Sequence, residues 1–172
     1  MGATASRRIK AADSDEAKGD SAAASSRPVD YGMLDQRLGY VLRRAQVAVF
    51  RDFFSAFEPY DLRPGQYSIL TVIESNPGLK QGEVGEALGI KRANFVAMID
   101  ELERRKLVRR AESLGDRRSY ALMLTARGAR LMPELHALSE RHERRLIEAI
   151  GIETYRALAA PLKILAALGD DF

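Results

Sequence analysis

The sequence predicts a mainly α-helical fold of the α+β class, with one short β-hairpin placed between helices. Through most of the chain after residue 30, apolar residues recur at spacings of three and four, as they do along the buried face of a helix. The exception is the segment 107–124, where two short apolar runs flank the polar, glycine-containing stretch 113–119. Such a pattern is typical of two strands joined by a turn.

The helices are separated by clear stop signals. The first, at about 31–58, ends at Pro59, and a second from about 62 is closed by the turn residues 76–78. Two short helices around 84–88 and 95–102 precede the hairpin. After it, Thr125 is the expected N-cap of a helix that Gly151 ends. A last helix follows from about 153, and we expect a kink or break at Pro161.

Composition limits the classes of function. The chain has 172 residues, 46% hydrophobic and 30% charged, and no cysteine, which excludes disulfides, thiolate nucleophiles and thiol redox sensing. No run approaches the roughly 18–20 apolar residues that span a bilayer. No apolar stretch follows Arg7 and Arg8, so we expect no signal peptide, no membrane partner and a cytoplasmic location.

The two short helices and the hairpin have the order of a winged helix-turn-helix. In the second helix, Phe95, Met98, Ile99 and Leu102 form a stripe expected to face the core. The opposite, exposed side then carries residues suited to contacts with base edges in a major groove, while the hairpin tip reaches the flanking minor groove or backbone. These expected DNA-binding residues are Lys91, Arg92, Asn94 and Ala97.

Charge distribution supports this placement better than total charge does. The whole chain has a formal net charge of only +3, with a pI of about 9.3. The segment 91–118 alone has nine Lys or Arg and five Asp or Glu, a difference of +4. A basic excess on a unit that fits the grooves of DNA indicates binding to nucleic acid. The alternative is a basic face that is merely solvated.

Residues 31–168 resemble the MarR family of bacterial regulators. The resemblance rests on the segments 81–90 and 100–110, and above all on a wing signature. That signature consists of an aspartate and an arginine one residue apart, two spaced leucines, then threonine and glycine: Asp116, Arg117, Arg118, Leu122, Leu124, Thr125 and Gly128.

The resemblance implies a homodimer that binds a pseudo-palindromic double-stranded DNA site and is released by a small ligand. It divides the domain 30–172 into a DNA-binding lobe at about 62–125 and dimerisation helices at about 31–58 and 126–170. Arg118 is then the wing arginine that enters the minor groove, with Arg117 beside it. Asp116 is its salt-bridge partner or, alternatively, forms an ordinary Asx turn.

Some positions depart from the family pattern. Lys80 and Lys91 stand where the family has a Ser or Thr N-cap, a loss of roughly 1 kcal/mol per helix unless another group substitutes. Lys106 replaces a common glycine after the recognition helix, so a left-handed residue there is expected to be mildly strained. The methyl of Ala97 contacts a thymine methyl or simply avoids a clash.

A small organic effector is the remaining route to regulation, since cysteine is absent. Aromatic residues crowd the end of the first helix and the start of the second, two turns after a pair of arginines able to hold a carboxylate or phosphate. This suits an aromatic acid or its CoA thioester, as in the hydroxycinnamoyl-CoA-responsive members that the chain resembles. The alternatives are an aromatic core and a dimeric DNA-binding protein without effector. The expected ligand-binding residues are Arg43, Arg44, Phe53, Phe57 and Tyr67.

Catalysis, cofactors and metals are not expected. The chain has no glycine-rich phosphate loop, nucleophile elbow or cluster of histidines with carboxylates. His136 and His142 lie six apart on one expected helix, where metal ligands pair at three or four, so we expect surface or interface residues. Residues 1–29 have almost no large apolar side chain and predict a disordered tail, either inert or an arm that contacts DNA phosphates.

Overall fold

The computed structural model describes residues 29–113 and 116–168, without the side chains of 112–119. The predicted tail therefore lies almost wholly outside the described residues. The α+β prediction is confirmed, since helices flank one antiparallel pair of strands. The α-helices and strands are α1 (Leu38–Phe57), α2 (Pro64–Ser75), α3 (Gln81–Ala87), α4 (Arg92–Arg104), β1 (Val108–Ser113), β2 (Asp116–Leu124), α5 (Ala126–Ile150) and α6 (Ile152–Ala167); 3-10 turns at Gly32–Gln36 and Glu58–Tyr60 flank α1.

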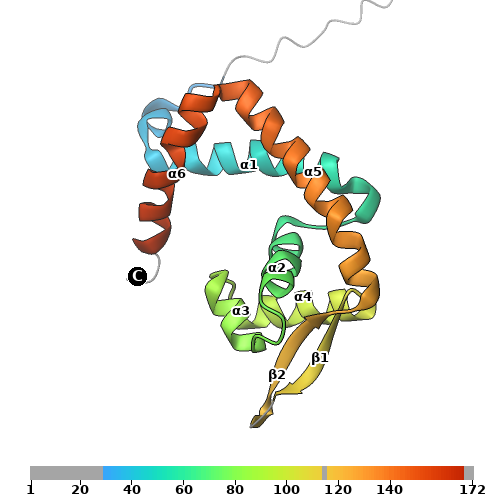
Figure 1. The fold of residues 1–172 in the computed structure, drawn as a ribbon. Coiled ribbons are helices and arrows are strands. Elements are labelled where there is room, and N and C mark those ends of the chain that lie inside the picture. Colours follow the sequence, from blue (N-terminus) through green and yellow to red (C-terminus); the bar gives the residue numbers. More distant parts are fainter. Residues whose placement is uncertain (1–28, 114–115, 169–172) are drawn as a thin grey trace, which may run out of the picture.

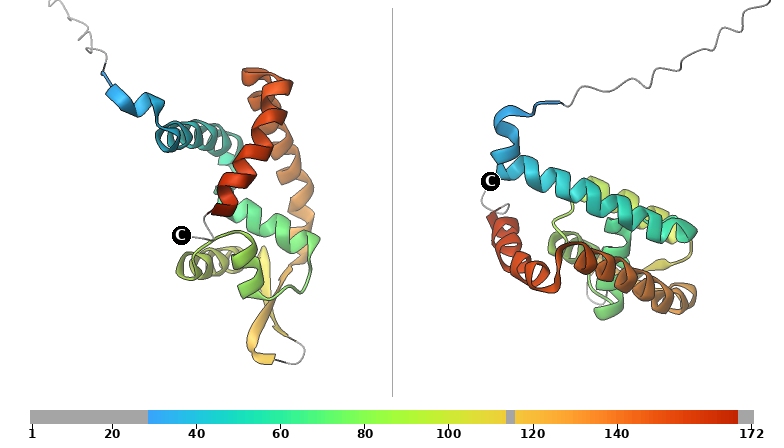
Figure 2. Two further views of the ribbon diagram at one scale, coloured as in Figure 1. Left: turned by 90° about the vertical axis from the view of Figure 1, so that its left-hand side faces the viewer. Right: turned by 90° about the horizontal axis from the view of Figure 1, so that it is seen from above.

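The elements form two parts, which we call the arm (α1, α5 and α6) and the lobe (α2, α3, α4 and the β1–β2 hairpin). Figure 1 shows α1 and α5 crossing above the lobe, with the hairpin projecting from its far end. The left view of Figure 2 shows the same separation, with α5 running from the base of the hairpin up to α6. Within the part of the chain that the structure describes, no helix is both long and apolar enough to cross a membrane.

One continuous hydrophobic core joins the lobe to the near end of the arm. The ends of α1 and α5 contribute side chains to the same cluster as α2, α4 and the hairpin, so the recognition unit rests directly on the arm. Burial of this kind is the main favourable contribution to folding. The most fully buried members are Phe57, Ile69, Leu70, Ile73, Val84, Ile99, Leu102, Leu107, Val108, Leu122, Met132 and Leu135.

The hairpin is longer than its apolar runs indicate. Val108 pairs with Leu124 and Glu112 with Tyr120, and the register shifts between Glu112 and Ser113. The turn after α2 adds to the sheet, because the Gly78 N–H donates to the Leu122 carbonyl and the Leu122 N–H to the Leu79 carbonyl, both at 2.9 Å. The base of the wing is thereby attached to the helix-turn-helix, a contact that apolar periodicity does not predict.

The predicted cap at Thr125 is confirmed. Its hydroxyl accepts a hydrogen bond from the Gly128 N–H at 3.0 Å and donates one to the Lys106 carbonyl at 2.6 Å. Gly151 ends α5 with a φ of 82°, but α6 runs continuously through Pro161, so the expected break does not occur. Lys106 does adopt the left-handed conformation, with a φ of 58°, which is mildly unfavourable for a residue with a Cβ.

A partly buried polar cluster holds α1 against α5. The Asp52 carboxylate of α1 accepts from the Arg145 guanidinium at 2.8 and 2.9 Å and contacts His142 Nδ1 at 2.5 Å. His142 is only 4% exposed and meets the ring of Phe53 edge-on. The prediction that both histidines are surface or interface residues is therefore wrong for His142, because Asp52 on α1 satisfies its Nδ1 atom and lets it be buried.

This cluster makes stability depend on acid. The Arg145 guanidinium, assisted by His142, lowers the pKa of Asp52 from 3.8 to about 2. A depressed carboxyl pKa contributes stability above the unfolded value of 3.8 and loses it as the pH falls toward about 2. We expect Asp52→Asn to remove on the order of 1 kcal/mol of unfolding free energy at neutral pH, after allowance for solvent screening, and to flatten the loss between pH 4 and 2.

Urea unfolding at a series of pH values measures this effect. Glu153→Gln is the matched control, because it removes a carboxylate whose contact with Arg156 is long, at 3.8 Å, and exposed. If the unfolding free energies of the wild type and of Asp52→Asn changed in parallel with pH, the cluster around Asp52 would not be the source of the acid sensitivity.

Candidate nucleic-acid interface

The recognition helix α4 presents the face that the sequence predicts. Phe95, Ile99 and Leu102 are buried and Met98 is half-buried against the core. Lys91, Arg92, Asn94 and Ala97 are all exposed, at the start of the helix and on its opposite side. The expected orientation of this helix is confirmed, whereas contacts of these four side chains with DNA stay a prediction.

Close packing of α3 on α4 sets the position of that face. A Cβ at Gly85 would lie 3.3 Å from the Phe95 ring, so the small residue lets the two helices approach. At the start of α3, the Glu83 carboxylate accepts from the Lys80 N–H at 2.7 Å and partly replaces the missing Ser or Thr cap. Lys91 makes no side-chain cap on α4 and is exposed.

The residues predicted for the wing tip lie at the limit of the described structure. Asp116, Arg117 and Arg118 belong to β2 by their backbone, but their side chains lie outside the described residues. Their roles, including the choice between a salt bridge and an Asx turn for Asp116, stay predictions.

Arg110 on β1 is a residue whose role sequence reasoning missed. Its guanidinium donates to Asp100 Oδ1 at 2.6 Å and to Glu103 Oε2 at 2.5 Å, both on α4, and to Gln81 Oε1 of α3 at 3.0 Å. Its backbone N–H donates to Glu103 as well. The available signal was the spacing of three between two carboxylates, Asp100 and Glu103, on one face of the helix.

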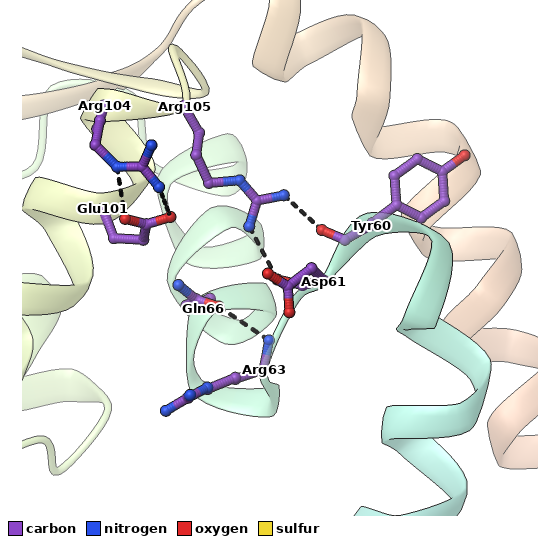
Figure 3. Close-up of polar contacts among 7 residues, drawn as sticks. All are labelled: Tyr60, Asp61, Arg63, Gln66, Glu101, Arg104 and Arg105. Carbon is purple, nitrogen blue, oxygen red and sulfur yellow. Dashed lines mark hydrogen bonds and ion pairs between the residues drawn. The ribbon is translucent and has the colours of Figure 1, made fainter.

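Two further arginines near the end of α4 also have partners within the protein. Arg104 forms a bidentate pair with Glu101 at 2.6 and 2.9 Å, and Arg105 donates to the backbone carbonyls of Tyr60 and Asp61 (Figure 3). Arg105 thus ties the end of α4 to the corner between α1 and α2. The difference of +4 counted over 91–118 already subtracts Asp100, Glu101 and Glu103, so these contacts leave it unchanged and show only which cations have partners within the protein.

A cavity of about 810 Å³ separates α4 from the hairpin. Its walls are formed by the start of α3, one flank of α4 and the strands. Cationic side chains and an exposed aromatic ring lie in these walls. The main lining residues are Gln81, Gly82, Arg92, Val96, Arg110 and Tyr120.

The structure brings three of the five predicted effector residues together but not the two arginines, since the Tyr67 ring centroid lies 6.1 and 5.1 Å from those of Phe53 and Phe57. Phe53 and Phe57 are 6% and 0% exposed and stack on each other with centroids 4.0 Å apart. They belong to the core, the alternative that aromatic spacing left open. Arg43 precedes Phe53 by ten residues, about 15 Å along a helix, and Arg44 lies over the rings of Tyr31 and Tyr40 at 5.3 and 5.9 Å.

Tyr67 alone of the five lines a described cavity. That cavity, of about 360 Å³, lies between α2 and α5 and also takes in His136, Glu143, Arg144 and Ile147. The Tyr67 hydroxyl is 3.0 Å from His136 Nδ1, and His136 Nε2 is 2.6 Å from Glu74. Sequence reasoning missed His136 and Arg144 as cavity residues, because only the fold places this part of α5 against α2.

Known proteins share this arrangement. The sequence profile of the MarR family matches residues 60–119. The transcriptional repressor CouR, bound to a 23-mer DNA duplex, superposes with a TM-score of 0.77 at 43% identity, covering 81% of this chain and 99% of that one. CouR bound to p-coumaroyl-CoA gives 0.73 at 40% identity, covering 84% and 100%.

A curated relative is more distant. The putative transcriptional regulatory protein for the hcr operon of Thauera aromatica is 35% identical over 106 residues. That match takes in 61% of this chain and 64% of the relative, so the chain spans slightly less than two thirds of its length. The PcaV regulator from Streptomyces coelicolor, in complex with its natural ligand, has a TM-score of 0.71 at 23% identity, which is a likeness of fold alone.

Proposed function

The chain belongs to the MarR family, and on that premise we propose that it is a sequence-specific DNA-binding transcriptional regulator, a cytoplasmic repressor that a small aromatic acid or its CoA thioester releases from DNA. The observation that carries the proposal is the exposed start of α4, with Lys91, Arg92 and Asn94 pointing away from the core beside a projecting hairpin. This is the geometry of a helix that reads a major groove while a wing contacts the adjacent backbone or minor groove. Its relatives are regulators, so we propose no catalytic role.

The cavity between α4 and the hairpin fits this function. Whenever a helix occupies a major groove and a wing occupies the neighbouring minor groove, one sugar-phosphate strand passes between them. Arg92 and the exposed Tyr120 line the space where that strand would cross. We propose that these side chains contact its phosphates.

Two copies are needed for a pseudo-palindromic site. None of the described residues of α6 is buried, and Leu158, Leu162 and Leu168 are each more than 40% exposed. An apolar helix face of this size left in water by a single copy supports a homodimer formed through the arm. Two lobes then face half-sites about one helical turn apart, roughly 34 Å.

The cavity between α2 and α5 is the effector site we propose. It lies between lobe and arm, so a ligand there favours one spacing of the two parts over another, as release from DNA requires. The Tyr67 hydroxyl, held by His136, supplies a hydrogen-bonding group for a phenolic ring, and Arg144, whose contact with Glu140 is long at 4.0 Å, supplies a cation. The bound p-coumaroyl-CoA of CouR supports an aromatic acyl thioester as the ligand.

Release of an operator duplex tests both the function and the site. We expect p-coumaroyl-CoA to displace the wild-type protein from a duplex selected out of a random pool, and to raise its melting temperature. Arg144→Met is expected to raise the concentration needed for release by about tenfold or more, the scale of a charged hydrogen bond. Arg43→Met, on the exposed surface of α1, is the matched control and should release normally.

Other outcomes separate the alternatives. Operator binding without any response to p-coumaroyl-CoA, CoA or p-coumarate would favour the effector-independent DNA-binding protein. A response lost in Arg43→Met and kept in Arg144→Met would place the anion at α1. Failure to select any duplex would contradict the DNA-binding function itself.

A further inference from the structure

We propose that Arg110 is a positioning residue for DNA binding, which holds the wing at the separation from α4 that lets both engage the same duplex. This inference rests on the proposed function. The four side chains involved, which we call the wing clamp, are Gln81, Asp100, Glu103 and Arg110.

The clamp connects every element that faces the duplex. Arg110 lies on β1 directly opposite Leu122, on the same face of the strand as the buried Val108. Its contacts reach Asp100 and Glu103 on α4 and Gln81 at the start of α3. One guanidinium therefore connects the wing, the recognition helix and the helix before it.

The chemistry of the clamp is that of a rigid joint. A guanidinium presents five donors in one plane, so binding two carboxylates and an amide oxygen at once fixes its orientation. The Arg110 side chain is only 19% exposed, which shields these contacts from water more than a surface pair. A lysine would keep the charge and lose the planar fork.

The location of the clamp explains why rigidity matters there. Arg110 lies in the wall of the cavity between α4 and the hairpin, where we place the crossing strand. The backbone bonds of Leu122 hold only the base of the hairpin, whereas the clamp acts on the face toward α4. Without it, the wing is free to swing, and each encounter with DNA must order it again at an entropic cost.

The arginine itself is not a phosphate contact. Its charge is balanced by two carboxylates, and both of these lie on the side of α4 next to the proposed DNA path. Positioning and simple electrostatics consequently predict opposite results when the two carboxylates are neutralised. Simple electrostatics predicts tighter DNA binding, because two negative charges near the phosphates disappear. Positioning predicts weaker binding to the operator, because the clamp opens.

The decisive variant is therefore Asp100→Ala combined with Glu103→Ala, with Arg110 intact, because alanine removes both the charge and the acceptor oxygen. We expect its affinity for a selected operator to fall by about tenfold in 0.15 M salt, while its affinity for a random duplex is unchanged or higher. Arg110→Lys should lower the affinity for the operator to a similar extent. Arg109→Lys is the matched control, since it alters the next residue on the same strand, which is exposed and contacts Met123.

A double-mutant cycle with Arg118→Ala identifies the wing as the intermediary. If the clamp acts through the wing, opening it costs little more once Arg118 is gone, so the two effects do not add. The salt dependence of operator binding should also become shallower in the clamp variant, because wing contacts with phosphates are lost. A role in folding alone would lower the melting temperature and leave the cycle additive.

Each result bears on the proposal. Operator binding by the Asp100→Ala, Glu103→Ala variant that equals or exceeds the wild type overturns the clamp, and so does an additive cycle. Wild-type binding and a normal loss in Arg118→Ala are measured in the same series, so the clamp can fail while the proposed function stands. Absence of wild-type operator binding would instead refute the function.

Discussion

Replacing Gly128 by alanine is expected to destabilise the protein by about 3 kcal/mol or more, enough to abolish cooperative folding of a marginally stable domain. A Cβ at this position would lie 2.1 Å from the Leu107 carbonyl oxygen and 3.0 Å from its carbon. The obstacle is backbone, so no side chain can rotate away. Relief requires that the start of α5 move away from the turn between α4 and β1.

The surrounding hydrogen bonds prevent such a movement. The Gly128 N–H donates to the Thr125 hydroxyl, while the Thr125 N–H donates to the Leu107 carbonyl at 3.0 Å. Separating α5 from Leu107 therefore breaks the cap as well as the contact. Thr125→Ala, which removes the cap and the hydroxyl's bond to the Lys106 carbonyl but keeps the backbone bond to Leu107, should cost about 1 kcal/mol.

Urea unfolding followed by circular dichroism measures the difference. Gly82→Ala is the matched control, because Gly82 is also a helical glycine but a Cβ there meets nothing within 4 Å. That change should stabilise the helix by roughly 0.5–1 kcal/mol. Two alanine variants of equal stability would show that the junction between wing and α5 is looser than its geometry indicates.

Replacing Arg118 by alanine is expected to reduce operator affinity by about 10- to 100-fold, with the fold and the dimer intact. The reason is its place in the wing signature at the end of an exposed hairpin, where a guanidinium reaches the narrow minor groove and its negative potential. A groove contact of this type contributes roughly 1–3 kcal/mol. Arg118 lies near the start of β2, just after the hairpin turn and away from the strand pairs nearest the core. Its loss should therefore not affect stability.

Gel-shift titration against a selected operator gives the affinity, and light scattering gives the oligomeric state. Arg130→Ala removes the same charge from the exposed surface of α5 and should change operator affinity little. Equal affinities for wild type and Arg118→Ala would count against a wing that enters the groove, even if the helix α4 still binds DNA.

Local sequence signals predicted much of this protein well. The apolar stripe of α4 determined which side of that helix is buried, because a period of 3.6 residues assigns faces without knowledge of any partner. The stops and caps were equally local, as Thr125 and Gly151 show. The left-handed Lys106 followed from its place after a helix end, since its N–H donates to Glu103 and that of Leu107 to Leu102.

Contacts between distant segments were beyond such signals. The aromatic residues of α1 looked like one group in sequence, yet Phe53 and Phe57 pack into the core, and Arg43 lies too far along the helix to share a site with them. Periodicity identifies an apolar face but does not tell whether a helix, a ligand or a partner subunit covers it. For the same reason the sequence predicted a surface or interface position for His142, whereas the structure places Asp52 beside it.

The sequence by itself determined the fold class, the recognition helix and the wing signature, because each depends on residues within a few positions of one another. Only the tertiary structure decided which cations already have partners within the protein and which cavity lies between the arm and the lobe. Arg110 illustrates the reason: an isolated arginine is simply a positive charge. Its role is defined by Asp100, Glu103 and Gln81, which the fold brings to it from two other elements.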